Sequence, residues 1–218
     1  MDPLGEAVMR RARILRARGR AALSVTALTV AAALSVGAAF TGAGGDARAA
    51  DAAPVHYAMV AAQSHLEFIG TQAGAPFTGV FHSFTANIDF APDALAGSKF
   101  DVSITLASVD SGDKERDDTI RGTDVFDVAH YPTAHYVTHA ITRTASGYSA
   151  SGSLTLHGVT REVPVQFTFA SAASGTKLVG SAQLKRLDFG VGQGDWKSTD
   201  AVKNEVKVAF TLVLSPAH

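Results

Sequence analysis

The segment Val206–Leu214, VKVAFTLVL, has an apolar side chain at every second position. A period of two is typical of a β-strand with one buried face, because successive side chains of a strand point to opposite sides. The positions between them hold Lys207, Ala209, Thr211 and Val213, so the second face is mixed. One apolar face and one mixed face are typical of antiparallel sheets. The segment therefore predicts an antiparallel strand.

The same alternation recurs along the chain from Val55 onward and predicts eight strands in all. The other candidates are Val80–Phe90, Phe100–Leu106, Tyr148–Leu156, Val163–Phe169 and the shorter Leu66–Ile69, Ala134–Ile141 and Leu178–Leu187. Turns rich in Gly, Pro, Asp and Ser separate these runs. Pro164 interrupts one run, which predicts an edge or a bulge at that point because proline has no backbone N–H to donate.

The long segment between Ser111 and Pro132 lacks the strand pattern, and its charged middle, Asp113–Arg121, predicts a short helix before Gly122. Acidic residues there lack the regular oxygen spacing and closing glutamate of a calcium loop. Interleaved charges of both signs are typical of a solvated helix face. Because the helix lies in the longest connection, it is a candidate lid over one end of the fold.

Eight antiparallel strands in about 165 residues close most economically into a barrel. The predicted fold class is all-β, an eight-stranded antiparallel up-and-down barrel, with one short helix in the 111–132 connection. A two-sheet sandwich with a similar number of strands is the alternative. Periodicity alone does not distinguish the two.

The first fifty residues predict an export signal. Six arginines lie within the first twenty residues, and uncharged Ala21–Phe40 and an A-x-A site at Ala47–Ala49 follow. We interpret 1–49 as an export signal cleaved near Ala49, 50–54 as a flexible linker and 55–215 as the barrel domain. An uncleaved membrane anchor remains an alternative, since about twenty apolar residues can span a bilayer.

Composition excludes several classes of function. The chain has no cysteine, which excludes disulfides, thiolate metal sites and cysteine nucleophiles. Residues 1–49 hold seven of the 19 basic and three of the 20 acidic residues, so the remaining 169 residues carry a net charge of −5. A weakly acidic domain is a poor match for nucleic acid or anionic lipid, so we expect no nucleic-acid partner and only transient membrane contact.

No nucleophile elbow, zinc-protease motif or phosphate-binding glycine loop occurs in the sequence, so we expect no enzyme and no catalytic residue. Four histidines, His82, His135, His139 and His157, raise the question of a metal site. His135 and His139 would share one strand face, but four residues of extended chain separate them by roughly 13 Å. We expect them to be surface residues and expect no metal site.

Several motifs, in order and spacing over residues 55–214, resemble those of the YceI family. They are Ser64–Phe68 (SHLEF), Gly79–Phe84 (GVFHSF), Ser108–Gly112 (SVDSG), Phe126–Pro132 (FDVAHYP), Gly152–Thr160 (GSLTLHGVT) and Arg186–Gly192 (RLDFGVG). The stretch Gly190–Trp196 resembles the branch of that family whose members are associated with a membrane di-haem cytochrome b.

This resemblance implies a periplasmic, lipocalin-like barrel that binds, transports or stores a polyisoprenoid lipid, either a polyprenyl quinone such as ubiquinone or a polyprenol. It implies no catalytic residue and no cofactor besides the bound lipid. A membrane cytochrome b is a candidate partner, and a homodimer is compatible with the sequence. The alternatives are a stress or structural protein with a solid barrel that acts through a protein partner, and an enzyme or haem-linked redox partner that uses the histidines.

An eight-stranded barrel can be filled by its own side chains or can hold one slender ligand. Clustered phenylalanines, including Phe77 and Phe90, could line such a tunnel or could form a solid core. The residues that we expect to line the barrel and bind the lipid are Phe68, Phe81, Phe84, Ile88, Ile104, Leu106, Phe126, Tyr136, Leu154, Phe167, Phe189, Trp196 and Phe210.

Overall fold

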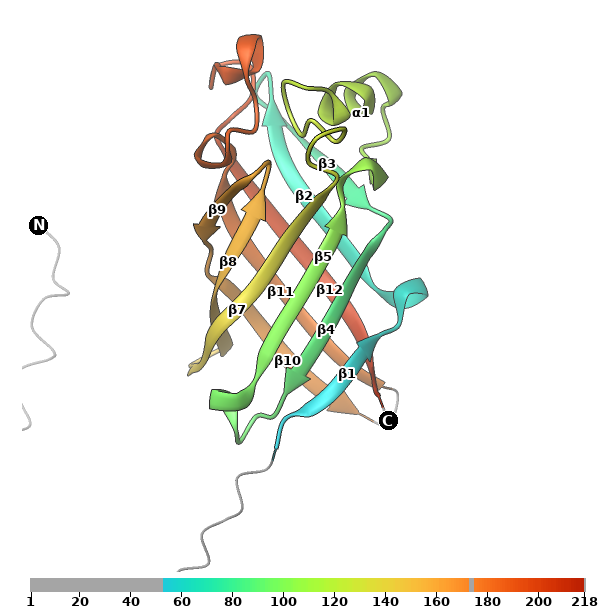
Figure 1. Cartoon of the computed structure of the whole chain (residues 1–218), viewed down its shortest axis with the longest axis vertical. Helices are drawn as coiled ribbons and strands as arrows, with labels where there is room; N and C mark the ends of the chain where they lie inside the picture. The colour runs from blue at the N-terminus through green and yellow to red at the C-terminus, as the bar shows by residue number, and fades with distance from the viewer. Residues whose placement is uncertain (1–52, 173–174, 218) are drawn as a thin grey trace, which may run out of the picture. The chain divides into compact units, whose positions relative to one another are not determined.

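The alternating segments pair edge to edge in a ring that closes where the last strand meets the first (Figure 1). The computed structural model describes residues 53–172 and 175–217. They form a closed antiparallel barrel of eight strands with one short α-helix, as predicted, and the sandwich alternative is wrong. The predicted export signal, 1–49, and most of the predicted linker lie outside the described residues.

Four barrel strands are continuous, and four are each broken into two segments. The continuous strands are β7 (Thr133–Thr144), β8 (Gly147–Leu156), β11 (Gly175–Lys185) and β12 (Glu205–Pro216). The broken ones are β1 (Val55–Met59) with β2 (His65–Gln72), β3 (Ala75–Phe81) with β4 (Phe84–Phe90), β5 (Lys99–Thr105) with β6 (Val109–Asp110), and β9 (Val159–Glu162) with β10 (Val165–Ala172). Strand β12 pairs with both β1 and β2, which closes the ring.

The break between β3 and β4 corrects one prediction. The alternation from Val80 to Phe90 predicts a single uninterrupted face, but the strand is interrupted at His82 and Ser83. Before the break, odd-numbered Phe77 and Phe81 face the interior, and after it even-numbered residues do. Val80 and His82 therefore belong to the outer face. The interruption predicted at Pro164 is confirmed, since β9 ends before it and β10 begins after it.

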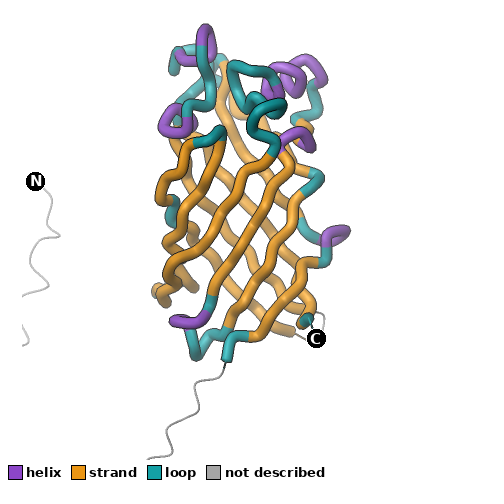
Figure 2. Tube along the Cα trace, in the orientation of Figure 1, coloured by secondary structure: helices purple, strands orange, loops and turns teal. Residues whose placement is uncertain are grey.

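The predicted helix is confirmed as α1 (Lys114–Arg121). The carboxylate of Asp113 caps it by accepting hydrogen bonds from the backbone N–H groups of Glu115 and Arg116, at 3.0 and 3.1 Å. Short 3₁₀ segments are η1 (Ala61–Gln63), η2 (Leu95–Gly97), η3 (Leu106–Ser108), η4 (Arg186–Phe189) and η5 (Gly194–Lys197). Figure 2 shows α1, η4 and η5 at one end of the barrel, which we call the mouth end. No helix in the described part of the chain is long and apolar enough to cross a membrane.

A close approach between β7 and β8 requires a glycine at position 152. A β-carbon at Gly152 would lie 2.5 Å from the carbonyl oxygen of Val137 and 2.7 Å from the hydroxyl of Tyr136. We expect Gly152→Ala to lower the free energy of unfolding by about 2 kcal/mol, because backbone must move to admit the methyl group. Urea denaturation measures this. Ser151→Ala, at the exposed neighbouring position, should change it by less than about 0.5 kcal/mol. Equal stability of the two variants would contradict the expectation.

Candidate binding cavity

The barrel encloses a cavity of about 500 Å³. This volume lies within the range of roughly 300–1,000 Å³ that is typical of small-molecule sites. The walls consist of the inward-facing side chains of the barrel strands, and the mouth end is lined by α1 and by the chain between Arg186 and Val202. The interior is therefore a hollow, largely apolar chamber at the mouth end of the barrel.

All of the lining residues predicted from the sequence line this cavity, with the exception of Phe167. Their contact with a ligand stays a prediction. Further residues that the same alternation indicates also line the cavity and were not among those predicted, namely Leu66, Phe100, Val102, Ala134, Leu156, Val163, Val165, Leu178, Ala182, Leu184, Val206, Val208 and Leu212. Val125, Val191 and Val202 also line the cavity from outside the strands, where no periodic pattern marks them.

A cluster of aromatic rings fills the other end of the barrel, and we call it the floor cluster. It consists of Tyr57, Phe90, Phe100, Tyr148, Phe167 and Phe169. The ring centroids of Phe90 and Phe169 are 4.5 Å apart, and those of Phe100 and Phe167 are 5.0 Å apart. Phe167 was expected to line the cavity, and the structure instead places it in the packed rings beneath. Phe90, for which the sequence left lining and solid core open, packs there too.

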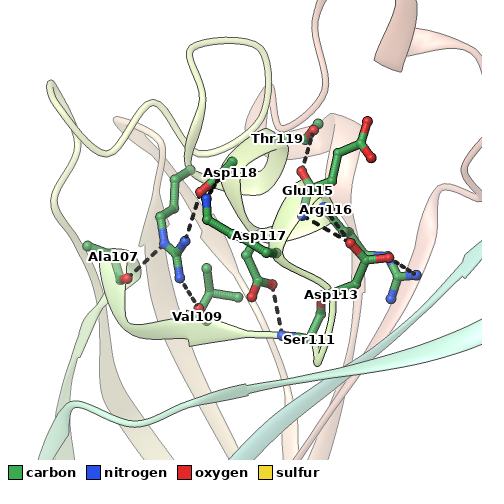
Figure 3. A network of polar contacts seen from close by, with 11 residues as sticks. Ala107, Val109, Ser111, Asp113, Glu115, Arg116, Asp117, Asp118 and Thr119 are labelled. Carbon is green, nitrogen blue, oxygen red and sulfur yellow. Dashed lines mark hydrogen bonds and ion pairs between the residues drawn. The ribbon is translucent and has the colours of Figure 1, made fainter.

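The helix α1 is fastened to the strand below it by side chains on one face (Figure 3). The carboxylate of buried Asp117 accepts a hydrogen bond from the backbone N–H of Ser111 at 2.8 Å. The guanidinium of Arg121 donates to the carbonyl oxygens of Ala107, at 3.0 Å, and Val109. Because these contacts hold the helix in place, buried Ile120 faces the cavity. The expected place of α1 over one barrel end is confirmed, and its movement as a lid stays a prediction.

Polar side chains reach the cavity chiefly at its mouth. Asp113, Glu115, Arg116 and Thr119 from the α1 region and Gln72 from the end of β2 contribute to the lining. The guanidinium of Arg116 lies 4.7 Å from the ring centroid of Phe77 and 3.6 Å from the carboxylate of Asp113. Such a cation above an aromatic face is held in place by the ring quadrupole. The mouth thus combines hydrogen-bond donors and acceptors with an apolar entrance.

Arg186 organises the other side of the mouth. Its side chain is buried and donates hydrogen bonds to the carbonyl oxygens of Val191, Ser198, Val202 and Lys203, at 2.9, 3.3, 2.8 and 3.1 Å. Burial lowers the pKa of Arg186, yet a guanidinium remains charged in proteins. Hydrogen bonds from this planar group therefore hold the chain between residues 191 and 203 at the mouth. Arginine at this position was not among the predicted site residues, because nothing in a linear pattern marks its carbonyl partners.

The middle of the cavity offers no free ionisable group among the residues that the structure describes. Tyr136 is the polar side chain there, and its hydroxyl donates a hydrogen bond to the carbonyl oxygen of Val163 at 3.2 Å. Burial raises the pKa of Tyr136 to about 12, with Glu162 as a smaller cause. The phenol is thus neutral near pH 7, and its proton is already engaged. The chamber suits a hydrocarbon.

Three of the histidines that invited a metal interpretation, His82, His135 and His139, lie on the outer face, and His157 lies in the turn between β8 and β9. His135 pairs with Asp101 at 2.8 Å, and His139 bonds Ser153 at 2.6 Å. His82 contacts Asp110, whose pKa is lowered chiefly by the backbone N–H of Gly112 and next by this histidine. His157 packs on the ring of Tyr131 with centroids 4.6 Å apart. Within residues 53–172 and 175–217, no group of three or more potential ligands is placed to hold a metal ion.

Comparison with known families agrees with this architecture. The model of the YceI-like domain matches residues 57–214, which is nearly the whole barrel. This chain belongs to the YceI-like domain family. A UPF0312 protein of Vibrio parahaemolyticus is 29% identical over 138 residues, which cover 60% of this chain and 73% of the relative. One of Azotobacter vinelandii is 32% identical over 120 residues, 52% of this chain and 62% of the relative.

Solved structures share the YceI-like barrel. BcnA of Burkholderia cenocepacia is 35% identical and superposes with a TM-score of 0.69, covering 72% of this chain and 99% of that chain. A polyisoprenoid binding domain from Saccharophagus degradans is 20% identical, with a TM-score of 0.59 and coverage of 75% of this chain and 99% of that chain. At that identity, the second likeness shows the fold alone. Neither comparison bears on the expected cytochrome b branch.

Proposed function

We propose that this YceI-like protein binds a polyisoprenoid lipid, either a polyprenyl quinone such as ubiquinone or a polyprenol, with the tail inside the barrel. The observation that carries the proposal is the shape of the cavity: an apolar chamber that is closed by the floor cluster at one end and bordered by polar side chains at the other. A long hydrocarbon with one polar terminus has the same distribution of polarity. The empty space also argues against the alternative of a solidly packed barrel.

The energetics favour a hydrocarbon tail. Each methylene group that leaves water for an apolar site contributes about 0.8 kcal/mol. The side chains of Phe68, Ile104 and Leu154 provide such a site, and the hydroxyl of Tyr136 is already satisfied. A ligand with polar groups along its length would find no partners for them in the chamber and would be penalised for their desolvation.

The polar head group belongs at the mouth. Arg116 and Gln72 supply N–H donors there, and Glu115 supplies an acceptor. A hydroxyl or a quinone carbonyl at this end would keep access to water and to these side chains, whereas the same group at the floor would meet aromatic rings. Tail-first entry through the mouth follows from this difference.

The name of the Saccharophagus degradans domain, polyisoprenoid binding, supports the choice of ligand class. We further propose a carrier or storage role in the periplasm, without catalysis, after removal of residues 1–49 as an export signal. A membrane cytochrome b would then be a donor or acceptor of the bound quinone. Lipid exchange at a membrane would need only transient contact.

Native mass spectrometry of the protein purified from its own cells tests the proposal. We expect a mass excess equal to one lipid per barrel, and organic extraction should release a polyprenyl quinone or a polyprenol. Sequencing of the purified amino terminus in the same sample tests cleavage near Ala49. We expect stoichiometric recovery because release of a buried lipid tail into water is unfavourable.

The matched control is the same protein after delipidation, which should take up added ubiquinone or polyprenol and regain the mass excess. A protein that is purified empty and also fails to take up either lipid would contradict the proposal. A protein partner that recognises the outside of the barrel would then become the leading explanation.

A further inference from the structure

The cavity stops abruptly along three strands of the barrel. On β10, Val165 lines it, as does Val163 just before the strand, whereas Phe167, the next inward-facing residue, does not. On β4, Ile88 lines it and Phe90 does not. On β12, Leu212 is the last lining residue. On β4 and β10 the boundary thus coincides with an aromatic residue.

The rings at this boundary are closely packed. Phe90 is fully buried and Phe167 is 3% exposed. Their centroids are 5.7 Å apart, and Tyr148 lies 5.1 Å from Phe90 and 5.2 Å from Phe167. A β-carbon at Gly180 would come within 2.9 Å of Phe167 Cβ and 2.5 Å of Phe210 Cζ, so the glycine lets the wall close on these rings.

Strand pairing makes the floor cluster stiff. Phe90 lies opposite Val55, and Phe167 is paired on its two sides with Tyr148 and Gly180. The rings therefore project from hydrogen-bonded segments of the barrel wall. Close-packed aromatic side chains on such segments cannot separate for a ligand without loss of their mutual contacts. The floor is a fixed end wall.

From these observations we propose that the floor cluster limits the length of isoprenoid chain that the barrel can shelter. The inference rests on the proposed function and adds a selectivity to it. A chain that enters tail first ends against Phe100, whose side chain both lines the cavity and packs on Phe167. Any further isoprene units remain at the mouth, in contact with water.

The depth of the chamber follows from strand geometry. The lined part of β12, Val206–Leu212, spans roughly 15 Å along the barrel axis at a rise of about 3.3 Å per residue and a tilt of about 40°. Each methylene group buried within this depth increases affinity about fourfold. Units beyond it add almost nothing. Affinity should therefore rise with chain length and then level off.

Binding of a series of polyprenols, each one isoprene unit longer than the last, to the delipidated full chain tests this limit. Fluorescence competition against a lipid probe gives each affinity. For the wild type we expect a rise followed by a plateau. In Phe167→Leu and Phe167→Ala, the plateau should move to longer chains, because a smaller side chain opens the floor. In Val165→Phe, it should move to shorter chains, because a ring would occupy the deepest part of the cavity.

Val109→Ala is the matched control, since Val109 is buried but does not line the cavity, and its truncation should leave the plateau in place. Circular dichroism of each variant checks folding, and Val165→Phe tests the limit independently of any loss of floor packing. Affinity that keeps rising with length, or a plateau that neither Phe167→Leu nor Val165→Phe moves, would overturn the length limit alone. Failure of the wild type to bind every member would overturn the proposed function instead.

Discussion

Phe84→Asp should leave the barrel empty of lipid. Phe84 faces the cavity from β4 and lies opposite Ile104 on β5, which faces it too. A carboxylate in this wall would face hydrocarbon, because the described cationic residues of the lining, Arg116 and Arg186, lie at the mouth and already have partners. We expect a penalty of at least about 3 kcal/mol, which is more than a hundredfold loss of affinity. Native mass spectrometry and uptake of added ubiquinone measure the effect.

The pH dependence of Phe84→Asp provides an internal check. Desolvation by lipid would raise the pKa of the new carboxyl, so the acid can be neutral in the complex when it is ionised in the empty protein. Affinity should therefore improve as the pH falls from 7 toward the ordinary carboxyl value of about 3.9, whereas wild-type affinity should not follow this trend.

Thr85→Asp is the matched control for this prediction, because the next residue on β4 is exposed and points away from the cavity. It adds the same charge and should leave lipid binding within a few-fold of the wild type. Retention of lipid by both Phe84→Asp and Ile104→Asp would show that the ligand does not occupy this chamber.

Arg186→Met should produce the largest loss of stability. The guanidinium satisfies four backbone carbonyl oxygens, from Val191, Ser198, Val202 and Lys203, and methionine can satisfy none of them. Hydrogen bonds to charged groups contribute about 1.5–3 kcal/mol each, and buried orphaned acceptors are costly. We expect a loss of at least about 3 kcal/mol, or roughly 6–12 °C in Tm, measured by thermal denaturation with the lipid removed.

Two variants test the cause of that loss. Arg186→Lys keeps the charge but lacks the planar fork, so it should recover only part of the stability. Lys203→Met makes the same type of change at an exposed position of the same segment and should alter the free energy of unfolding by less than about 0.5 kcal/mol. Equal stability of Arg186→Met and the wild type would contradict the role of Arg186 in holding the mouth.

The strands could be predicted from the sequence because the side chains of an alternating run have only two faces to occupy. Along Val206–Leu214 and Tyr148–Leu156, the apolar residues at every second position predict which side chains face inward. In the structure these even-numbered residues do face the barrel interior. The same logic fails at His82 and Ser83, where one barrel strand is broken and the inward parity changes from odd to even. A local break of this kind depends on how the strand bends to stay in the ring.

The position at which the cavity ends along the barrel could not be predicted from alternation. Val165 and Phe167 are adjacent inward positions of one strand, and alternation gives them the same status. Only the approach of Phe90, Phe100 and Tyr148 from three other strands makes Phe167 part of a packed floor, while Val165 borders open space. Depth along the barrel is a property of several strands together.

The sequence by itself determined the all-β class, the short helix in the 111–132 connection and the apolar face of most strands, because these depend on periodicity and on neighbours within a few residues. Closure into a barrel rather than a sandwich followed only from the strand pairing. The tertiary structure alone decided where the cavity ends, which polar groups border its mouth and why Arg186 is buried with a charge. These features depend on residues far apart in the chain, such as Tyr57 with Phe169 and Arg186 with Lys203. These residues come into contact only when the strands pair and the barrel closes.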